Sequence, residues 1–245
     1  MPQSNAVIRL YEPKDKKLVQ FMVGKANLQA LAVANNKVYL HPLTIAIWLG
    51  LASVMIQYMN WWPAGKHGWM EYLKPLPALA SVAVPLMFFV DWINRPQFEE
   101  LTQQVMRYED LHDITSYYSK QSSSGFWILE LGDVFVGLIA VDASQSFDQS
   151  SSGTSAAIRH FHVEEAYRTT KIQNDLLKHA VNQAFDGNPK LNRIEALDSP
   201  FTPYIQQCLR ESGFQFARYI KEVGLLKWKL SIRYLERDAW LKRTA

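Results

Sequence analysis

Two uncharged apolar stretches near the start of the chain constrain its fold more than any other feature. The first, residues 42–62, reads PLTIAIWLGLASVMIQYMNWW. As a helix it would reach across a hydrocarbon core of ~30 Å, and its last two tryptophans are of the kind enriched at the headgroup level. The second stretch, residues 76–90, reads LPALASVAVPLMFFV and is shorter, with two prolines. Together they predict a membrane hairpin whose second segment is either a kinked, shallow span or a re-entrant segment.

The sequence leaves a second interpretation open, in which the two stretches are helices buried in a large soluble core. If both segments instead cross a membrane, the two ends of the chain lie on the same side. The basic residues that flank the hairpin on that side are Lys25, Lys37, Arg95 and Arg107, against Lys66 and Lys74 in the link. This bias and the single cysteine, Cys208, predict an intracellular membrane such as the endoplasmic reticulum, with both termini cytosolic.

The rest of the chain has the composition of a folded domain. Of the 245 residues, 48% are hydrophobic and 20% are charged, which excludes a disordered chain. The net charge is only +3, so no nucleic-acid partner is expected. We therefore expect one domain that the hairpin interrupts, with its first strand and helix in residues 1–37, the hairpin in 38–96 and the remainder in 97–245.

Periodicity predicts a mixed α/β domain on the two sides of the hairpin. Residues 6–11 alternate like a strand, and a basic helical stretch follows Pro13. Its expected apolar stripe consists of Leu18, Phe21, Met22 and Leu28. The later elements are expected to be a helix in 97–118, a β-hairpin in 125–141, a loop in 144–155, a strand in 156–163, a helix in 172–185, a strand in 193–197, a helix in 203–212 that Gly213 ends, and strands in 215–221 and 225–232.

This order of elements resembles that of the GNAT acyl-CoA N-acyltransferases, an α+β fold with a mixed sheet and helices on both faces. The local match lies in residues 97–143, with DITSYYSKQSSSGFWILELGDVFVGLIAV, and in residues 162–214, with VEEAYRTTKIQNDLLKHAV and LRESGF. A hydrophobic hairpin after the first strand and helix is similar to the membrane-anchored branch typified by cysteine-conjugate and aspartate N-acetyltransferases. The resemblance implies transfer of an acyl group from acetyl-CoA or another acyl-CoA to an amine.

The resemblance places the pyrophosphate of acyl-CoA at the turn between Val163 and a helix that begins at Ile172. A helix N-terminus offers free N–H groups and the positive end of the helix dipole to such an anion. The family pattern there is Gln/Arg-x-x-Gly-x-Gly/Ala, and the matching residues are Arg168, Thr169, Thr170, Lys171, Ile172 and Gln173. Arg168 fits, whereas Lys171 and Gln173 stand where small residues let the phosphates approach the backbone. The two threonines and Lys171 would add donors; the alternative is a loop that no longer binds CoA.

The implied reaction needs a base for the attacking ammonium and an acid for the leaving thiolate. His160 and His162 fall on one face of the strand before the turn and are candidates for the base, and Glu195 on the neighbouring strand is another. The position at which the family has its tyrosine acid is Leu209 here, so Tyr204 on the same helix is the candidate acid. The alternative is that these residues only pack. A His-x-His pair lacks further matched ligands, so no metal is expected.

Two functions remain after this reading. The first is a membrane-anchored N-acetyltransferase or N-acyltransferase that acts on a small-molecule or lipid-proximal amine at a bilayer. The second is a catalytically inactive GNAT-like adaptor or chaperone, whose partner is a polytopic membrane protein. The loss of both small residues and of the tyrosine favours the second.

Overall fold

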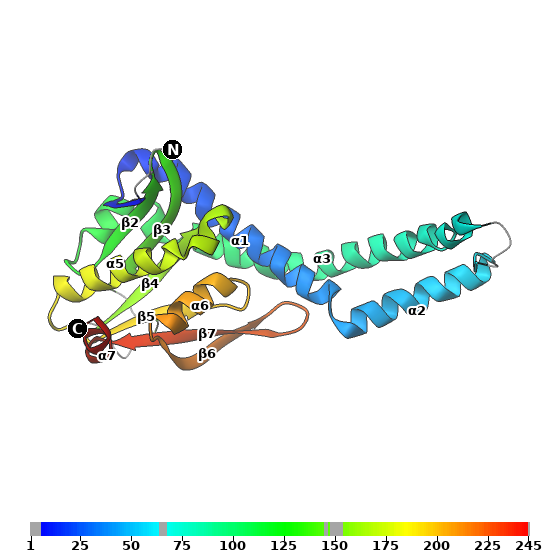
Figure 1. Ribbon diagram of the computed structural model, residues 1–245. Helices are drawn as coiled ribbons and strands as arrows, with labels where there is room; N and C mark the ends of the chain where they lie inside the picture. The colour runs from blue at the N-terminus through cyan, green and yellow to red at the C-terminus, as the bar shows by residue number, and fades with distance from the viewer. Residues whose placement is uncertain (1–5, 64–67, 145–146, 148–153, 245) are drawn as a thin grey trace.

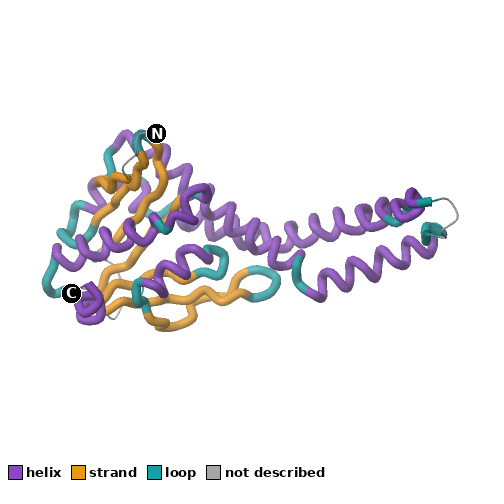
Figure 2. The backbone as a smooth tube through the Cα atoms, in the orientation of Figure 1, coloured by secondary structure: helices purple, strands orange, loops and turns teal. Residues whose placement is uncertain are grey.

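A sheet domain and a long helical hairpin that extends from it make up the protein (Figure 1; Figure 2). The computed structural model describes residues 6–63, 68–144, 147 and 154–244. Most of the loop predicted in 144–155 lies outside the described residues, as does the centre of the link between the two apolar stretches, including Lys66.

In the described part of the chain, seven strands form a single mixed sheet. They are β1 (Ala6–Leu10), β2 (Gly125–Leu131), β3 (Val134–Asp142), β4 (Ser155–Val163), β5 (Arg193–Asp198), β6 (Gln215–Val223) and β7 (Trp228–Glu236). Their order is β1-β2-β3-β4-β5-β7-β6, and each neighbouring pair is antiparallel except β4 and β5, which are parallel. The last strand, β7, was predicted to begin at residue 225. It begins three residues later, because residues 224–227 form the turn that precedes it.

Helices cover both faces of the sheet, as the family resemblance implied. On one face lie α1 (Lys16–Tyr39) and α4 (Ile114–Tyr118), and on the other lie α5 (Ile172–Gly187) and α6 (Pro203–Glu211). The first core consists of Val19, Met22, Val23, Leu111, Ile114, Tyr118, Phe126, Ile128, Leu138 and Ala140. The second core is larger and also takes in Trp240 of α7 (Arg237–Thr244). Alternate residues of β2 and β3 point into the two cores, which is why both strands are buried on both sides.

The two apolar stretches form antiparallel helices that contact each other and project away from the sheet (Figure 1). They are α2 (Pro42–Tyr58) and α3 (Leu76–Met106). Only Ala52 and Ile56 of α2 are buried, whereas Val54 and Val84 are 69% and 66% exposed. The interpretation as two buried core helices is therefore wrong. By length and composition, the segment Trp69–Met106 qualifies as one membrane-spanning helix, and α1 with α2, bent by 61°, qualifies together as a second.

Two predictions about the helices around the hairpin are wrong. The helix predicted in 97–118 is not separate, because α3 continues to Met106 and contains Pro85 and Pro96 within it. Of the apolar stripe predicted for α1, Met22 is buried, but Leu18, Phe21 and Leu28 are exposed, and Val19 and Val23 are fully buried instead. This helix carries apolar residues on most of its sides, so its sequence period did not define the side that meets the sheet.

Polar contacts fasten the base of the hairpin to the sheet domain. Asn35 of α1 donates to Asp91 of α3 at 2.8 Å, and Asn94 donates back to Asn35 at 2.9 Å. Asn94 is fully buried, and its Oδ1 accepts from the Leu225 N–H at 2.8 Å. Because each buried polar atom of this group is paired, the group fixes the position of α3 against the β6–β7 turn.

Candidate active site

The candidate site is the place where the parallel strands β4 and β5 separate. Their pairing covers four positions, from Ser155 opposite Arg193 to Ile158 opposite Ala196. At the point of separation β4 contains a bulge, since Ala140 and Val141 of β3 pair with His160 and Ile158 and skip Arg159. Beyond the bulge β4 continues to Val163 without a partner on β5.

A cavity of about 130 Å³ fills the gap between the two strands. Its walls are Ala26, Asn27 and Ala30 of α1, Ile158, Arg159, Phe161 and His162 of β4, Ala196 and Leu197 of β5, Ser199, and Thr202, Ile205 and Leu209 at α6. A much smaller cavity of about 10 Å³ continues toward the turn before α5, and Ala26 and His162 line both. The open space therefore ends where the turn begins.

His162 is the predicted base that lies in this cavity. Its Nδ1 is buried, and within the described part of the chain it has no hydrogen-bond partner. Burial, together with the positive charges of His160 and Arg168, lowers the pKa of His162 to about 3. At neutral pH the imidazole is therefore uncharged, with one ring nitrogen left for a ligand.

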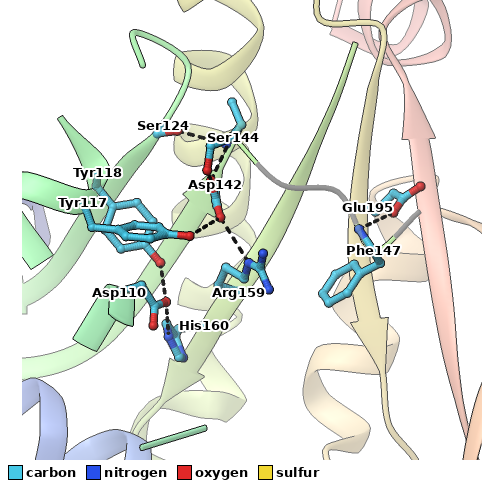
Figure 3. A network of polar contacts seen from close by, with 11 residues as sticks. Asp110, Tyr117, Tyr118, Ser124, Asp142, Ser144, Phe147, Arg159, His160 and Glu195 are labelled. Carbon is cyan, nitrogen blue, oxygen red and sulfur yellow. Dashed lines mark hydrogen bonds and ion pairs between the residues drawn. The ribbon is translucent and has the colours of Figure 1, made fainter. Parts of the chain in front are cut away.

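His160, the other predicted base, belongs to a buried network beside the cavity (Figure 3). Its Nε2 lies 2.8 Å from Asp110 Oδ2, to which Tyr118 also donates at 2.8 Å. Burial by itself would raise the pKa of Asp110, but the hydrogen bond and charge of His160 outweigh it and lower that pKa. His160 is thus held by a carboxylate, whereas His162 two residues later is not.

A second polar cluster surrounds Asp142 at the end of β3 (Figure 3). Tyr117 donates to Asp142 Oδ2 at 2.9 Å, Arg159 does so at 3.3 Å, and Ser144 donates to Oδ1 at 2.6 Å. Through Arg159, this cluster fixes the bulge at which β4 leaves β5. Neither Asp110 nor Asp142 was identified from the sequence, because the helix and strands that bring them to β4 lie far apart along the chain.

Arg168 and Tyr204 close the end of the gap nearest the turn. The Arg168 guanidinium lies 4.1 Å over the Tyr204 ring, donates through Nε to the Val163 carbonyl at 2.9 Å and through Nη2 to Gln29 at 2.8 Å. The Tyr204 hydroxyl accepts from the Val163 N–H at 3.5 Å, and burial raises its pKa. Both backbone groups of Val163 that face the gap are thus occupied by side chains.

The helix start predicted at Ile172 is confirmed, and the turn before it is a 3-10 helix, Glu165–Thr170. Ile172 and Gln173 are the first two residues of α5, so their N–H groups lie at the helix N-terminus, where backbone donors have no partner inside the helix itself. Lys171 adopts the left-handed conformation, with φ 59°, that the family's glycine would adopt freely. Its side chain points away toward Glu211, with 3.6 Å between Nζ and Oε1.

Gln173 turns into the inside of this turn. It is 6% exposed, donates through Nε2 to the Arg168 carbonyl at 3.1 Å, and has no partner at Oε1 within the described chain. Thr169 and Thr170 are exposed, and Thr170 donates to the Tyr167 carbonyl at 2.7 Å. Lys171 and Gln173 stand where the family has small residues. Gln173 therefore reduces the space inside the turn for a pyrophosphate, and Lys171 does not.

Glu195, the third candidate base, is engaged elsewhere, and the two residues next to each other on α6, Cys208 and Leu209, are buried. Glu195 is buried and accepts from the Phe147 N–H at 3.1 Å (Figure 3). Cys208 is buried, and burial raises its pKa to about 12, so the thiol stays protonated. Leu209 is fully buried in the cavity wall. In residues 6–63, 68–144, 147 and 154–244, no group of three or more His, Cys, Asp or Glu side chains is placed to hold a metal ion.

Comparison with known proteins identifies the fold. No protein-family model matches the chain, and no curated protein sequence matches it. Among solved structures, the spermidine N-acetyltransferase from Vibrio cholerae in complex with CoA and spermine aligns with a TM-score of 0.51 at 11% identity, over 97% of this chain and 99% of that one. The fold is that of the GNAT acetyltransferases. At this identity the alignment establishes the fold alone.

Two further GNAT-like structures align less closely. An acetyltransferase of the GNAT family from Streptococcus pneumoniae aligns with a TM-score of 0.49 at 9% identity, over 95% of this chain and 99% of that one. A putative acetyltransferase from Salmonella typhimurium, with acetyl-CoA as its cofactor, aligns with a TM-score of 0.48 at 12% identity, over 94% and 93%. The fold assignment does not depend on either.

Proposed function

We propose that the chain is a membrane-anchored N-acyltransferase that moves an acyl group from acetyl-CoA or another acyl-CoA to an amine. The observation that carries this proposal is the cavity between β4 and β5, which holds an uncharged histidine with an unpaired, buried Nδ1. A buried polar atom without a partner costs about 1–3 kcal/mol, so its retention favours a ligand that pairs with it. The V. cholerae enzyme of the same fold was crystallised with CoA.

In the proposed reaction, the amine nitrogen forms a bond to the thioester carbon and the bond from that carbon to sulfur breaks. His162 Nδ1 accepts the proton that the attacking ammonium loses, and the Tyr204 hydroxyl donates a proton to the leaving thiolate. Burial is the main reason that His162, with a pKa of about 3, is a weak base, and the charge of Arg168 adds to the effect. Pairing of Arg168 with a pyrophosphate would remove one of the positive charges that lower this pKa.

The residues around the turn fit acyl-CoA in part. The N–H groups of Ile172 and Gln173, with Thr169, Thr170 and Lys171 beside them, would hold the pyrophosphate. The acyl-CoA arm would then follow the free edge of β4, which requires Arg168 and Tyr204 to release Val163. The closed arrangement is thus one that a ligand has to open.

The anchoring part of the proposal is supported by the exposed apolar surface of α2 and α3. Contiguous apolar patches of more than a few hundred Å² are rare on soluble monomers, and here such side chains surround two neighbouring helices. Because the helices are antiparallel and both join the sheet domain, a hairpin that spans the bilayer leaves that domain on one side. We place this side in the cytosol and the membrane in the cell interior, for example in the endoplasmic reticulum.

Binding of acyl-CoA to the detergent-solubilised protein tests the enzymatic part. We expect heat of binding and a thermal shift with acetyl-CoA or a longer acyl-CoA, and a loss of both in Arg168→Ala with Lys171→Glu. Lys178→Glu is the matched control, because Lys178 is an exposed lysine on α5, about two helical turns beyond Lys171. No binding of any acyl-CoA to the parent protein would refute the proposal.

A second candidate function, a non-catalytic adaptor for a polytopic membrane protein, is favoured by one observation. Arg168 pairs with Val163, Gln29 and Tyr204 at once, an arrangement that stabilises the turn without a ligand. The adaptor predicts that Arg168→Ala with Lys171→Glu leaves activity in cells intact, provided that the protein level is unchanged. Loss of cellular activity at a normal protein level would exclude it.

A further inference from the structure

The turn between β6 and β7 carries exposed apolar and basic residues. Residues 221–229 read KEVGLLKWK, with three lysines against one glutamate. At its tip Leu225 and Leu226 are 42% and 38% exposed, and the Lys227 N–H closes the turn on the Gly224 carbonyl at 3.0 Å. An apolar tip flanked by lysines is typical of segments that lie in the interface of an anionic bilayer.

The contacts of this turn define its height along the hairpin. The Leu225 N–H donates to Asn94 Oδ1 and the Gly224 N–H to Gln97 Oε1, each at 2.8 Å. Asn94 lies about 4.5 Å of helix rise beyond Asp91, the first charged residue after the apolar part of α3. The turn therefore lies within about one helical turn of the level at which the apolar surface of the hairpin ends. Figure 1 shows the tip of β6 and β7 extending toward the start of α2.

The strands behind the tip are held rigidly. Val223 and Leu230 are buried in a cluster with Phe98 of α3 and Phe201, and the Phe201 ring packs edge-on against Trp228 at 5.3 Å. The two leucines thus stay exposed although their neighbours are buried. A fixed, apolar and basic tip level with the end of an apolar hairpin has the chemistry of a bilayer surface as its partner.

We propose that the β6–β7 turn is a second membrane contact, in which Leu225 and Leu226 enter the interface of an anionic bilayer while Lys221 and Lys227 lie against lipid phosphates. This inference rests on the proposed membrane anchoring of the hairpin. Its consequence is orientational: a hairpin alone lets the sheet domain tilt against the membrane surface, whereas a second contact beside the hairpin limits that tilt.

Site-directed fluorescence in vesicles tests the inference with the full chain. An environment-sensitive dye is attached to Leu226→Cys, to Val84→Cys in the hairpin and to Val134→Cys at the far β2–β3 turn, all in exposed positions. Cys208 is buried with a pKa of about 12 and does not compete for the dye. We expect lipid-like emission from Val84→Cys and Leu226→Cys, quenched by lipid-borne quenchers, and aqueous emission from Val134→Cys.

The outcomes separate the inference from the anchoring on which it rests. Lipid-like emission at position 84 with aqueous emission at 226 would overturn the second contact and leave the anchoring intact. Aqueous emission at both would overturn both. Adding phosphatidylserine to phosphatidylcholine vesicles should increase the signal at 226. Lys227→Gln should reduce that increase about fivefold, as about 1 kcal/mol per lysine implies, whereas Lys178→Gln should not. An equal response in both variants would overturn the role of Lys227.

Discussion

Replacing His162 with glutamine should flatten the acid side of the stability profile of the sheet domain. Burial, with the nearby charges of His160 and Arg168, lowers the pKa of His162 from about 6.5 to about 3. In the unfolded chain the same imidazole titrates near 6.5. Between these two values the unfolded state binds one more proton than the folded state, so stability is present above about pH 6.5 and is lost as the pH falls toward 3.

The size of the effect follows from this difference in bound protons. One extra proton in the unfolded state changes the free energy of unfolding by about 1.36 kcal/mol per pH unit. Because the unfolded imidazole is only half protonated at pH 6.5, integration between pH 6.5 and 4.5 gives a loss of about 2.3 kcal/mol from His162 alone. This is a large part of the ~5–15 kcal/mol by which a domain is stable. Glutamine does not titrate, so His162→Gln should lose this part of the slope.

Urea unfolding in detergent at a series of pH values measures the effect. Other groups also titrate in this range, and the difference between parent and variant isolates His162. The control is His112→Gln, which replaces an exposed histidine and should keep the parent slope. Parallel profiles for the parent and His162→Gln would refute the reasoning, because they would mean that the imidazole binds protons in the folded state as it does in the unfolded state.

Three further predictions concern contacts around the turn and the hairpin. Gln29→Ala should raise acyl-CoA affinity about tenfold in calorimetry, since a hydrogen bond to a charged group is worth ~1.5–3 kcal/mol and Arg168 must give it up on binding; unchanged affinity would contradict this. Lys171→Gly should raise the free energy of unfolding by up to about 1 kcal/mol. A left-handed residue with a Cβ costs ~1–2 kcal/mol, and the greater freedom of glycine in the unfolded chain offsets part of the gain. A destabilised variant would contradict this and mean that the lost contact with Glu211 contributes more than the relief of strain. Asn94→Ala should lower stability by about 2–3 kcal/mol and speed proteolysis of the β6–β7 turn, as the Leu225 N–H loses its acceptor; equal cleavage rates would refute it.

The sequence predicted those elements whose patterns are local. The β2–β3 hairpin, the helix start at Ile172 and the left-handed Gly213 after α6 each depend on a short run of residues, and each is confirmed. The α1 face and the continuity of α3 were not predictable in this way. The face of α1 depends on which of its sides meets the sheet. The prediction separated a segment in 76–90 from a helix beginning at 97, whereas α3 continues through both Pro85 and Pro96.

The candidate site residues stay a prediction, but the structure shows which of them lie together. The resemblance implied a pyrophosphate site at the turn before Ile172, and His160 and His162 lie on the strand before that turn, of which His162 lines the cavity between β4 and β5. The sequence could not distinguish His160 from His162, which share one strand and differ only in that Asp110 reaches the first. The pairing of Arg168 with Gln29 joins residues 139 positions apart, so no local pattern could have indicated that the turn is closed from the side of α1.

Helix α1 is the element on which the two candidate functions differ. It lines the cavity with Ala26, pairs with the turn before α5 through Lys25 to Glu164 and Gln29 to Arg168, and ends where the hairpin begins. An adaptor requires only that these contacts hold the domain rigidly on the hairpin. Breaking them should then lower stability and leave acyl-CoA affinity unchanged. A transferase requires that the contact between Arg168 and Gln29 opens when acyl-CoA binds. Weakening this contact should then lower stability and raise acyl-CoA affinity. The sign of the affinity change, measured beside the stability change in one variant, therefore separates a latent active site from a scaffold.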